Sequence, residues 1–177
     1  MKCILSILLF SLITLAAPVS QNFRLRILRT EGASGGPLSE YLGLKDGVAV
    51  ITKNPSEIIT AYLDPDPNGM LYTDKKIPGY LFPTDGTGTQ VYDFRFGGIP
   101  KRADVLFTNF TFVDRICQVC MPDKILAYFQ PKDDPSTRYE GQFRAYKDGE
   151  GWTLKFHASK PPSVEGSEGV DLIREAI

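Results

Sequence analysis

The chain has 177 residues, with 20 Lys and Arg against 21 Asp and Glu and a formal net charge of −1. This balance excludes the strongly basic field with which proteins gather nucleic acids or anionic membrane surfaces. Hydrophobic residues make up 42% and charged residues 23%, which excludes a disordered chain and suits one domain with a hydrophobic core. The 16 glycines and 13 prolines favour turns and short strands over long helices.

The N-terminal segment has the three parts of a secretory signal. Lys2 supplies a basic start, residues 4–15 form an apolar run, and Thr14-Leu15-Ala16 places small residues at a cleavage site before Ala17-Pro18. The run is shorter than the ~20 apolar residues of a membrane-spanning helix. We therefore expect residues 1–16 to be removed and the remaining chain to be extracellular, free or associated with a cell wall, without membrane attachment.

Cys117 and Cys120 stay in the chain after the predicted signal, which contains Cys3, has been removed. Outside the cell we expect them to form a disulfide. Bridged Cα atoms lie about 4.4–6.8 Å apart, and residues three apart in a strand are about 10 Å apart, so the segment must be a tight turn. Free thiols and a thioredoxin-like redox pair are the alternatives, and the redox pair would need a helix after Cys117.

From residue 23 onward, apolar and polar residues alternate with period two, which predicts β-strands. Asp46-Gly47 between two such segments predicts a tight hairpin turn. The expected strands are 23–29, 41–44, 48–51, 58–63, 70–72, 80–82, 90–96, 105–113, 125–129, 142–146 and 152–157. The pattern therefore predicts an all-β domain over residues 17–158. Residues 159–177 are expected to form a polar tail that ends in one or two turns of amphipathic helix.

Weak internal repeats accompany this pattern. Tyr41-Leu42-Gly43, Tyr62-Leu63-Asp64 and Tyr80-Leu81-Phe82 each border a turn that carries Gly or Asp, and residues 90–94 and 151–156 look like matching closing strands. On these segments, residues 23–158 resemble the β-trefoil-like small secreted proteins of fungi. The resemblance implies a β-trefoil, with a β-sandwich as the alternative. The chain departs from sugar-binding trefoils of the ricin type, whose repeats carry Gln-x-Trp. Here the pattern appears once, as Gln90-Val91-Tyr92, with Tyr in place of Trp.

Asn109-Phe110-Thr111 is a sequon for N-glycosylation in an exported chain. Strand alternation places Asn109 and Thr111 on one face and Phe110 on the other, which favours an exposed, glycosylated asparagine. Phe107 and Val113 have the same parity as Asn109, so the opposite interpretation buries it.

Asp64, Asp66 and Asn68, followed by Gly69, match the first half of an EF-hand calcium loop. The twelfth position should be a bidentate Glu and is Lys75. We therefore favour an acidic hairpin turn, with calcium binding as the alternative.

The sequence offers few catalytic groups. His157 is the single histidine, and alternation places it on the exposed face of its strand. No nucleophile-elbow or zinc-protease motif occurs. A pair of glycosidase-type carboxylates is the alternative, and its candidates are Asp93, Asp114, Asp133, Asp134 and Glu140.

Together these observations predict a secreted, non-catalytic binding protein that needs no cofactor. Its expected partner is an extracellular carbohydrate or protein, contacted through aromatic residues at its turns. The alternatives are a small secreted glycoside hydrolase and a secreted inhibitor or effector.

Overall fold

A computed structural model describes residues 21–30, 40–65, 68–84, 90–115, 123–129, 141–158 and 165–177. In these residues the chain forms twelve β-strands and no helix, which confirms the predicted all-β class. The strands are β1 (Phe23–Arg29), β2 (Tyr41–Lys45), β3 (Val48–Thr52), β4 (Ala61–Leu63), β5 (Leu71–Thr73), β6 (Gly79–Pro83), β7 (Val91–Phe96), β8 (Phe110–Asp114), β9 (Lys124–Tyr128), β10 (Gln142–Asp148), β11 (Gly151–His157) and β12 (Ser167–Ala176).

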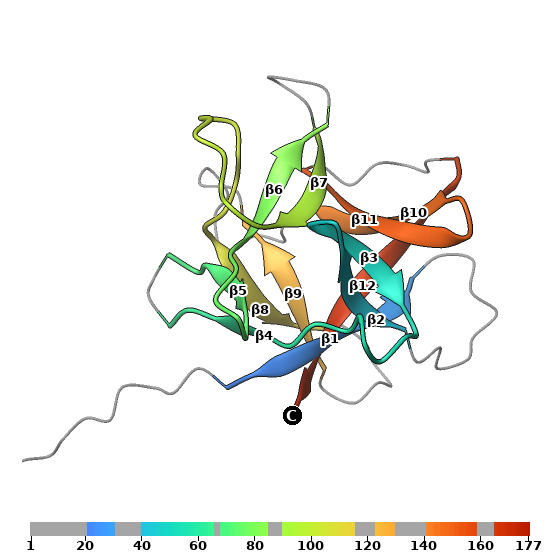
Figure 1. Cartoon of the computed structure of the whole chain (residues 1–177), viewed down its shortest axis with the longest axis horizontal. Helices are drawn as coiled ribbons and strands as arrows, with labels where there is room; N and C mark the ends of the chain where they lie inside the picture. Colours follow the sequence, from blue (N-terminus) through green and yellow to red (C-terminus); the bar gives the residue numbers. More distant parts are fainter. Residues whose placement is uncertain are drawn as a thin grey trace, which may run out of the picture.

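Seven strands close into a barrel, in the order β1, β2, β3, β7, β11, β10 and β12, because β12 pairs back onto β1. The closing pair is antiparallel and extends from Phe23 opposite Ala176 to Arg29 opposite Val170. The first and last strands of the described chain are therefore direct neighbours (Figure 1).

Three antiparallel hairpins, β2–β3, β6–β7 and β10–β11, pair with one another as well as internally. Val48 pairs with Arg95, and β11 pairs with both β3 and β7. Figure 1 shows these hairpins in the upper and right-hand parts of the molecule, with β4, β5, β8 and β9 on the left. The predicted turn between β2 and β3 is confirmed, since Asp46 and Gly47 both have the positive φ angles that such a turn requires.

The core fills the barrel and the space between it and β8–β9. Phe94 lies at its centre, with ring centroids 5.1 Å from Phe96, 5.5 Å from Phe143 and 5.9 Å from Phe110. Such tilted aromatic pairs add to the stabilisation that burial itself provides.

The C-terminal segment corrects one prediction, because residues 167–176 form strand β12 and not a helix. Leu172 and Ile173 are adjacent, so their side chains point to opposite faces of β12, and both are buried. A strand covered on both faces has no simple alternation, and its pattern then imitates that of a helix. The all-β domain therefore extends to Ala176.

Two other strands are shorter than predicted. The strand expected at 105–113 begins only at Phe110, because Asn109 has a φ of 70°. The strand expected at 58–63 begins at Ala61, and Ile58 contributes an isolated bridge to Gly43.

Candidate functional site

The outer face of the β6–β7 hairpin carries a cluster of aromatic and charged side chains. In the register of this hairpin Phe82 pairs with Asp93, whereas the buried Leu81 pairs with Phe94. Since paired residues of antiparallel strands point to the same face, Phe82, Asp93 and Arg95 lie on the face opposite to the core.

Two guanidinium groups lie over the Phe82 ring. The Cζ atom of Arg95 is 4.8 Å from the ring centroid and that of Arg102 is 5.0 Å from it. These distances are within the range of favourable cation–π contacts. We call Phe82, Asp93, Arg95, Arg102 and Asp104 the arginine–phenylalanine site.

Each arginine of this site is held by its own carboxylate. Arg102 donates through Nε and Nη2 to the two oxygens of Asp104, at 2.9 and 2.6 Å, and Arg95 Nη2 donates to Asp93 at 2.7 Å. The hydrogen bonds from Arg102 hold the pKa of Asp104 below its ordinary value. The carboxylates therefore fix the orientation of both guanidinium planes.

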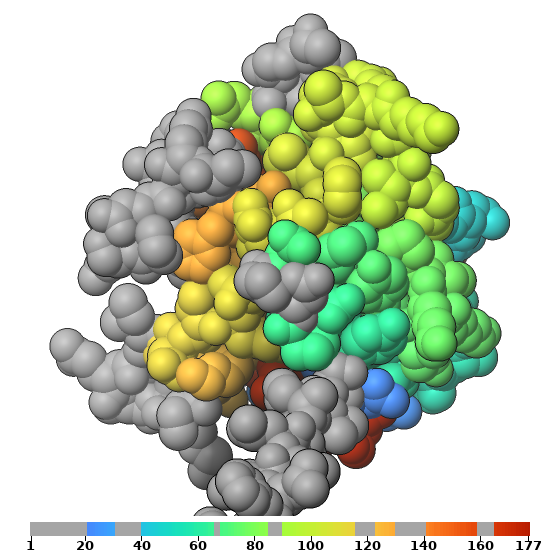
Figure 2. All heavy atoms as spheres, turned by 90° about the vertical axis from the view of Figure 1, so that its left-hand side faces the viewer, coloured from blue at the N-terminus to red at the C-terminus, as the bar shows by residue number. Residues whose placement is uncertain are grey.

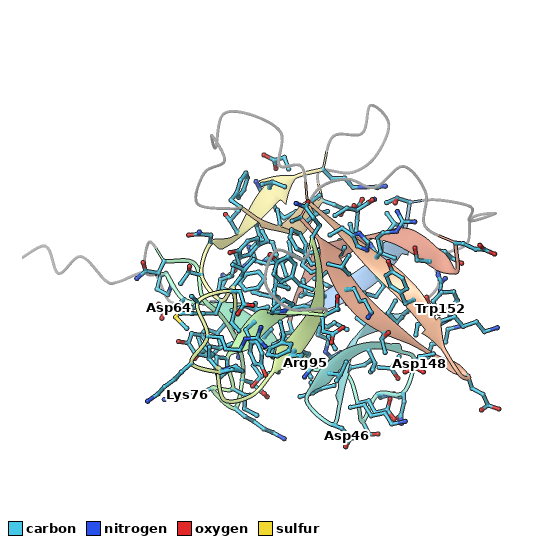
Figure 3. All side chains as sticks on the ribbon, turned by 90° about the horizontal axis from the view of Figure 1, so that it is seen from above. Asp46, Asp64, Lys76, Arg95, Asp148 and Trp152 are labelled. Carbon is cyan, nitrogen blue, oxygen red and sulfur yellow. The ribbon has the colours of Figure 1, made fainter. Side chains whose placement is uncertain are left out.

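This arrangement leaves donors for a ligand. Within the described part of the chain, Nη1 of Arg95 and Nη1 of Arg102 make no hydrogen bond, and Nε of Arg95 is buried without a partner. The side chains of Arg95 and Arg102 are 36% and 41% exposed, so a ligand in solvent can reach their guanidinium ends. In Figure 3, Arg95 lies on β7 between Asp64 on one side of the molecule and Trp152 on the other.

A chain of polar contacts continues from this site across β11 and β10. Asp93 also binds Lys155 Nζ at 3.1 Å, and this ammonium lies 5.5 Å from the centroid of the Tyr146 ring. The Tyr146 hydroxyl is 2.7 Å from Nε2 of His157, and the two rings are parallel at 6.0 Å.

The position of His157 contradicts the exposed face predicted for it, because only 6% of the residue is exposed. The Tyr146 ring is stacked on the imidazole of His157 and covers it. Burial, and then the charges of Arg144 and Lys155, lower the pKa of His157. The imidazole is therefore neutral near pH 7 and can accept the Tyr146 hydroxyl proton in a hydrogen bond.

A second charged group lies at one end of the barrel. Arg29 donates to Glu40, with Nη2 3.2 Å from Oε2, and also to Glu168, and its Cζ is 4.5 Å from the Trp152 ring centroid. Burial alone would lower the pKa of Arg29, but the two carboxylates outweigh it and raise this pKa. Both carboxylates are thus bound to one cation, which suits closure of the barrel better than acid–base chemistry.

The structure brings two of the sequence-predicted features together. The N–H of Asn109 donates to the carbonyl of Asn68 at 2.6 Å, and the N–H of Phe110 donates to that of Gly69 at 2.9 Å. The turn of the calcium hypothesis therefore lies against the sequon, as Figure 2 shows for the green β4–β5 segment and the yellow segment around β8. Asp66 lies outside the described residues, and within them no three His, Cys, Asp or Glu side chains group as metal ligands.

The remaining predicted residues are not gathered into one site. Cys117 and Cys120 lie outside the described residues, as do Asp133, Asp134 and Glu140. Asp93 binds two cations, as described above, and Asp114 is 74% exposed and paired with Lys124 at 2.6 Å.

The arginine–phenylalanine site was missed in the sequence because its members come from two strands and the loop that follows them. The available signals were Asp93 and Arg95 on one face of a predicted strand, and Arg102 two residues before Asp104. Comparison with family models, curated proteins and solved structures gave no match to this chain. In the residues that the structure covers, no helix is long and apolar enough to span a membrane.

Proposed function

We propose that this is a secreted, non-catalytic binding protein with a β-trefoil fold, and that its ligand is an acidic polysaccharide held at the arginine–phenylalanine site. One observation carries the proposal: two guanidinium groups share one aromatic ring, and each keeps Nη1 unpaired within the described residues. The secretion rests on the basic, apolar and small-residue parts of residues 1–17.

The strand pairing supports the trefoil. The twelve strands divide into three successive groups of four, and each group contributes one of the three hairpins that pair mutually. The outer strands follow the order β5, β4, β1, β12, β9 and β8, and the β4–β5 turn is hydrogen-bonded to the beginning of β8. In the trefoil interpretation these six strands form a ring that the three hairpins cap. The seven-strand barrel described above then consists of two strands of this ring, β1 and β12, and five hairpin strands. In the weak internal repeats, Tyr41 and Tyr80 occupy β2 and β6, the first hairpin strands of their groups.

The chemistry of the site favours an acidic group on the ligand. A guanidinium presents its N–H donors in a planar fork that matches the oxygens of a carboxylate or a sulfate. Asp93 and Asp104 orient the two forks before the ligand arrives, which reduces the conformational entropy lost on binding. Lys155 adds a third cation on the same face.

Binding is tested with the secreted full chain on immobilised dextran sulfate and polygalacturonate, with neutral dextran as the matched comparison. We expect retention on the acidic polymers only. Arg95→Gln with Arg102→Gln should weaken binding at least about tenfold, because each lost charge-assisted hydrogen bond contributes about 1.5–3 kcal/mol.

Arg24→Gln with Lys45→Gln is the matched control, since these are exposed cations on β1 and β2. An equal loss for this control would show that only net charge matters, and absence of binding to either acidic polymer would refute the ligand class. New reducing ends released from these polymers by the purified protein would overturn the non-catalytic function in favour of a hydrolase. Capture of extracellular proteins, without retention on the polymers, would favour an inhibitor or effector.

A further inference from the structure

Asn109 lies where three segments of the chain meet. Its backbone N–H donates to Asn68 in the β4–β5 turn, and its carbonyl accepts from the N–H of Phe129, which follows β9, at 3.1 Å. With a φ of 70°, it occupies the left-handed region, which asparagine tolerates better than most residues. The residue is therefore held rigidly at the point where β8 begins.

The side chain of Asn109, in contrast, is free. Within the described residues its amide makes no hydrogen bond. The buried side-chain polar atoms that lack a partner there belong to Arg95 and Arg174, so the Asn109 amide is not among them. The residue is half-buried, so an unpaired amide that is not buried must reach solvent. The sequence left open which face the sequon uses. Phe110, only 2% exposed, now marks the inner face, and Thr111 points outward.

An aromatic residue stands two positions before Asn109 in the chain. Phe107 is half-buried, lies outside the strand, and stands two residues before Asn109 with a bend of the chain at Thr108 between them. Sugars offer a face of C–H groups that packs on aromatic rings, and a half-exposed ring gains by being covered.

We propose that Asn109 carries an N-linked glycan whose first N-acetylglucosamine packs on Phe107 and thereby stabilises the junction of the β4–β5 turn with β8. This inference rests on the export in the proposed function. The donor is a lipid-linked oligosaccharide pyrophosphate. The Asn109 amide nitrogen forms a bond to C1 of the first sugar, the bond from C1 to the pyrophosphate oxygen breaks, the amide proton goes to the transferase base, and the lipid pyrophosphate leaves.

The experiment uses the full chain made in a eukaryotic secretory host. Occupancy is read from the mass of the tryptic peptide before and after peptide N-glycosidase, which converts a glycosylated Asn109 to Asp. Stability is read from melting temperatures. Thr111→Val removes the sequon without straining the left-handed Asn109, and Thr111→Ser keeps the sequon as the matched control. Phe107→Ala is made in both the glycosylated and the Thr111→Val backgrounds.

We expect Asn109 to be modified and Thr111→Val to melt at least about 2 °C below Thr111→Ser. Phe107→Ala should lower the melting temperature by at least about 2 °C more in the glycosylated background, since this excess measures the ring–sugar coupling separately from the packing of Phe107 itself. A secreted but unmodified Asn109 overturns the inference alone, and so do equal Phe107→Ala losses in the two backgrounds. Retention of the chain inside the cell overturns the export on which both proposals depend.

Discussion

Replacing Arg29 by Met should destabilise the fold far more than replacing Glu168 by Gln. Arg29 binds both Glu40 and Glu168, but the two carboxylates lie in different surroundings. The side chains of Arg29 and Glu40 are 11% and 10% exposed, whereas that of Glu168 is 35% exposed. Removing the arginine therefore leaves a buried carboxylate without its main counter-charge, and removing Glu168 leaves Arg29 still paired.

The expected magnitudes follow from this burial. Breaking a buried ion pair by removing one partner costs about 3–5 kcal/mol, because the remaining charge keeps its desolvation penalty. A half-exposed pair contributes about 1 kcal/mol or less. Arg29→Met combined with Glu40→Gln should recover part of the loss, since a neutral amide needs no counter-charge. Lys53, 3.8 Å from Glu40 and mostly exposed, can compensate only weakly.

Urea unfolding of the purified protein measures these differences. With a slope of about 2 kcal/mol per molar urea, Arg29→Met should lower the midpoint by about 1.5–2.5 M and Glu168→Gln by less than about 0.5 M. A midpoint for Arg29→Met within about 0.5 M of the parent chain would refute the reasoning. So would a double variant with Glu40→Gln that is no more stable than Arg29→Met alone.

Three further outcomes are expected. Gly69→Ala should lower the melting temperature more than Gly149→Ala, although both glycines have a φ of 57°. A Cβ at Gly69 would overlap the Phe110 carbonyl oxygen, whereas a Cβ at Gly149 meets nothing within 4 Å. Equal losses would contradict the close approach of Gly69 to Phe110. The lowered pKa of His157 keeps its imidazole neutral in the folded chain at pH values where the unfolded chain is already protonated, so stability should fall as the pH drops from 7 to 5. His157→Gln should flatten this part of the pH profile of the urea midpoint, and an unchanged profile would contradict the role of His157. Leu154→Ala, at a position with no exposure, should cost about 2–5 kcal/mol, and a loss below 1 kcal/mol in urea unfolding would contradict its burial.

Period-two alternation, together with the turn residues between the segments, predicted eleven of the strands. Phe23, Leu25 and Ile27 are all buried, as their spacing predicts. The prediction was wrong for β12, where the adjacent residues Leu172 and Ile173 are both buried. Local alternation cannot show that both faces of a strand will be covered.

The site was less predictable for a related reason. Alternation predicted an exposed His157, and this was wrong because the pattern could not show that the Tyr146 ring would cover the imidazole. Arg95 and Arg102 meet only because Phe82, from a different strand, lies under both guanidinium groups. Contacts that depend on pairing register and loop path leave little trace in the spacing of single residues.

The antiparallel pair of β1 with β12 has a consequence for how the protein is made. Its partners, such as Phe23 and Ala176, are separated by almost the whole described chain, so the barrel cannot be sealed until the last strand has been synthesised. Long-range pairing of this kind makes folding slow, because loop closure must precede the contacts that reward it. A nascent chain with this topology therefore stays open until its C-terminal strand has left the ribosome.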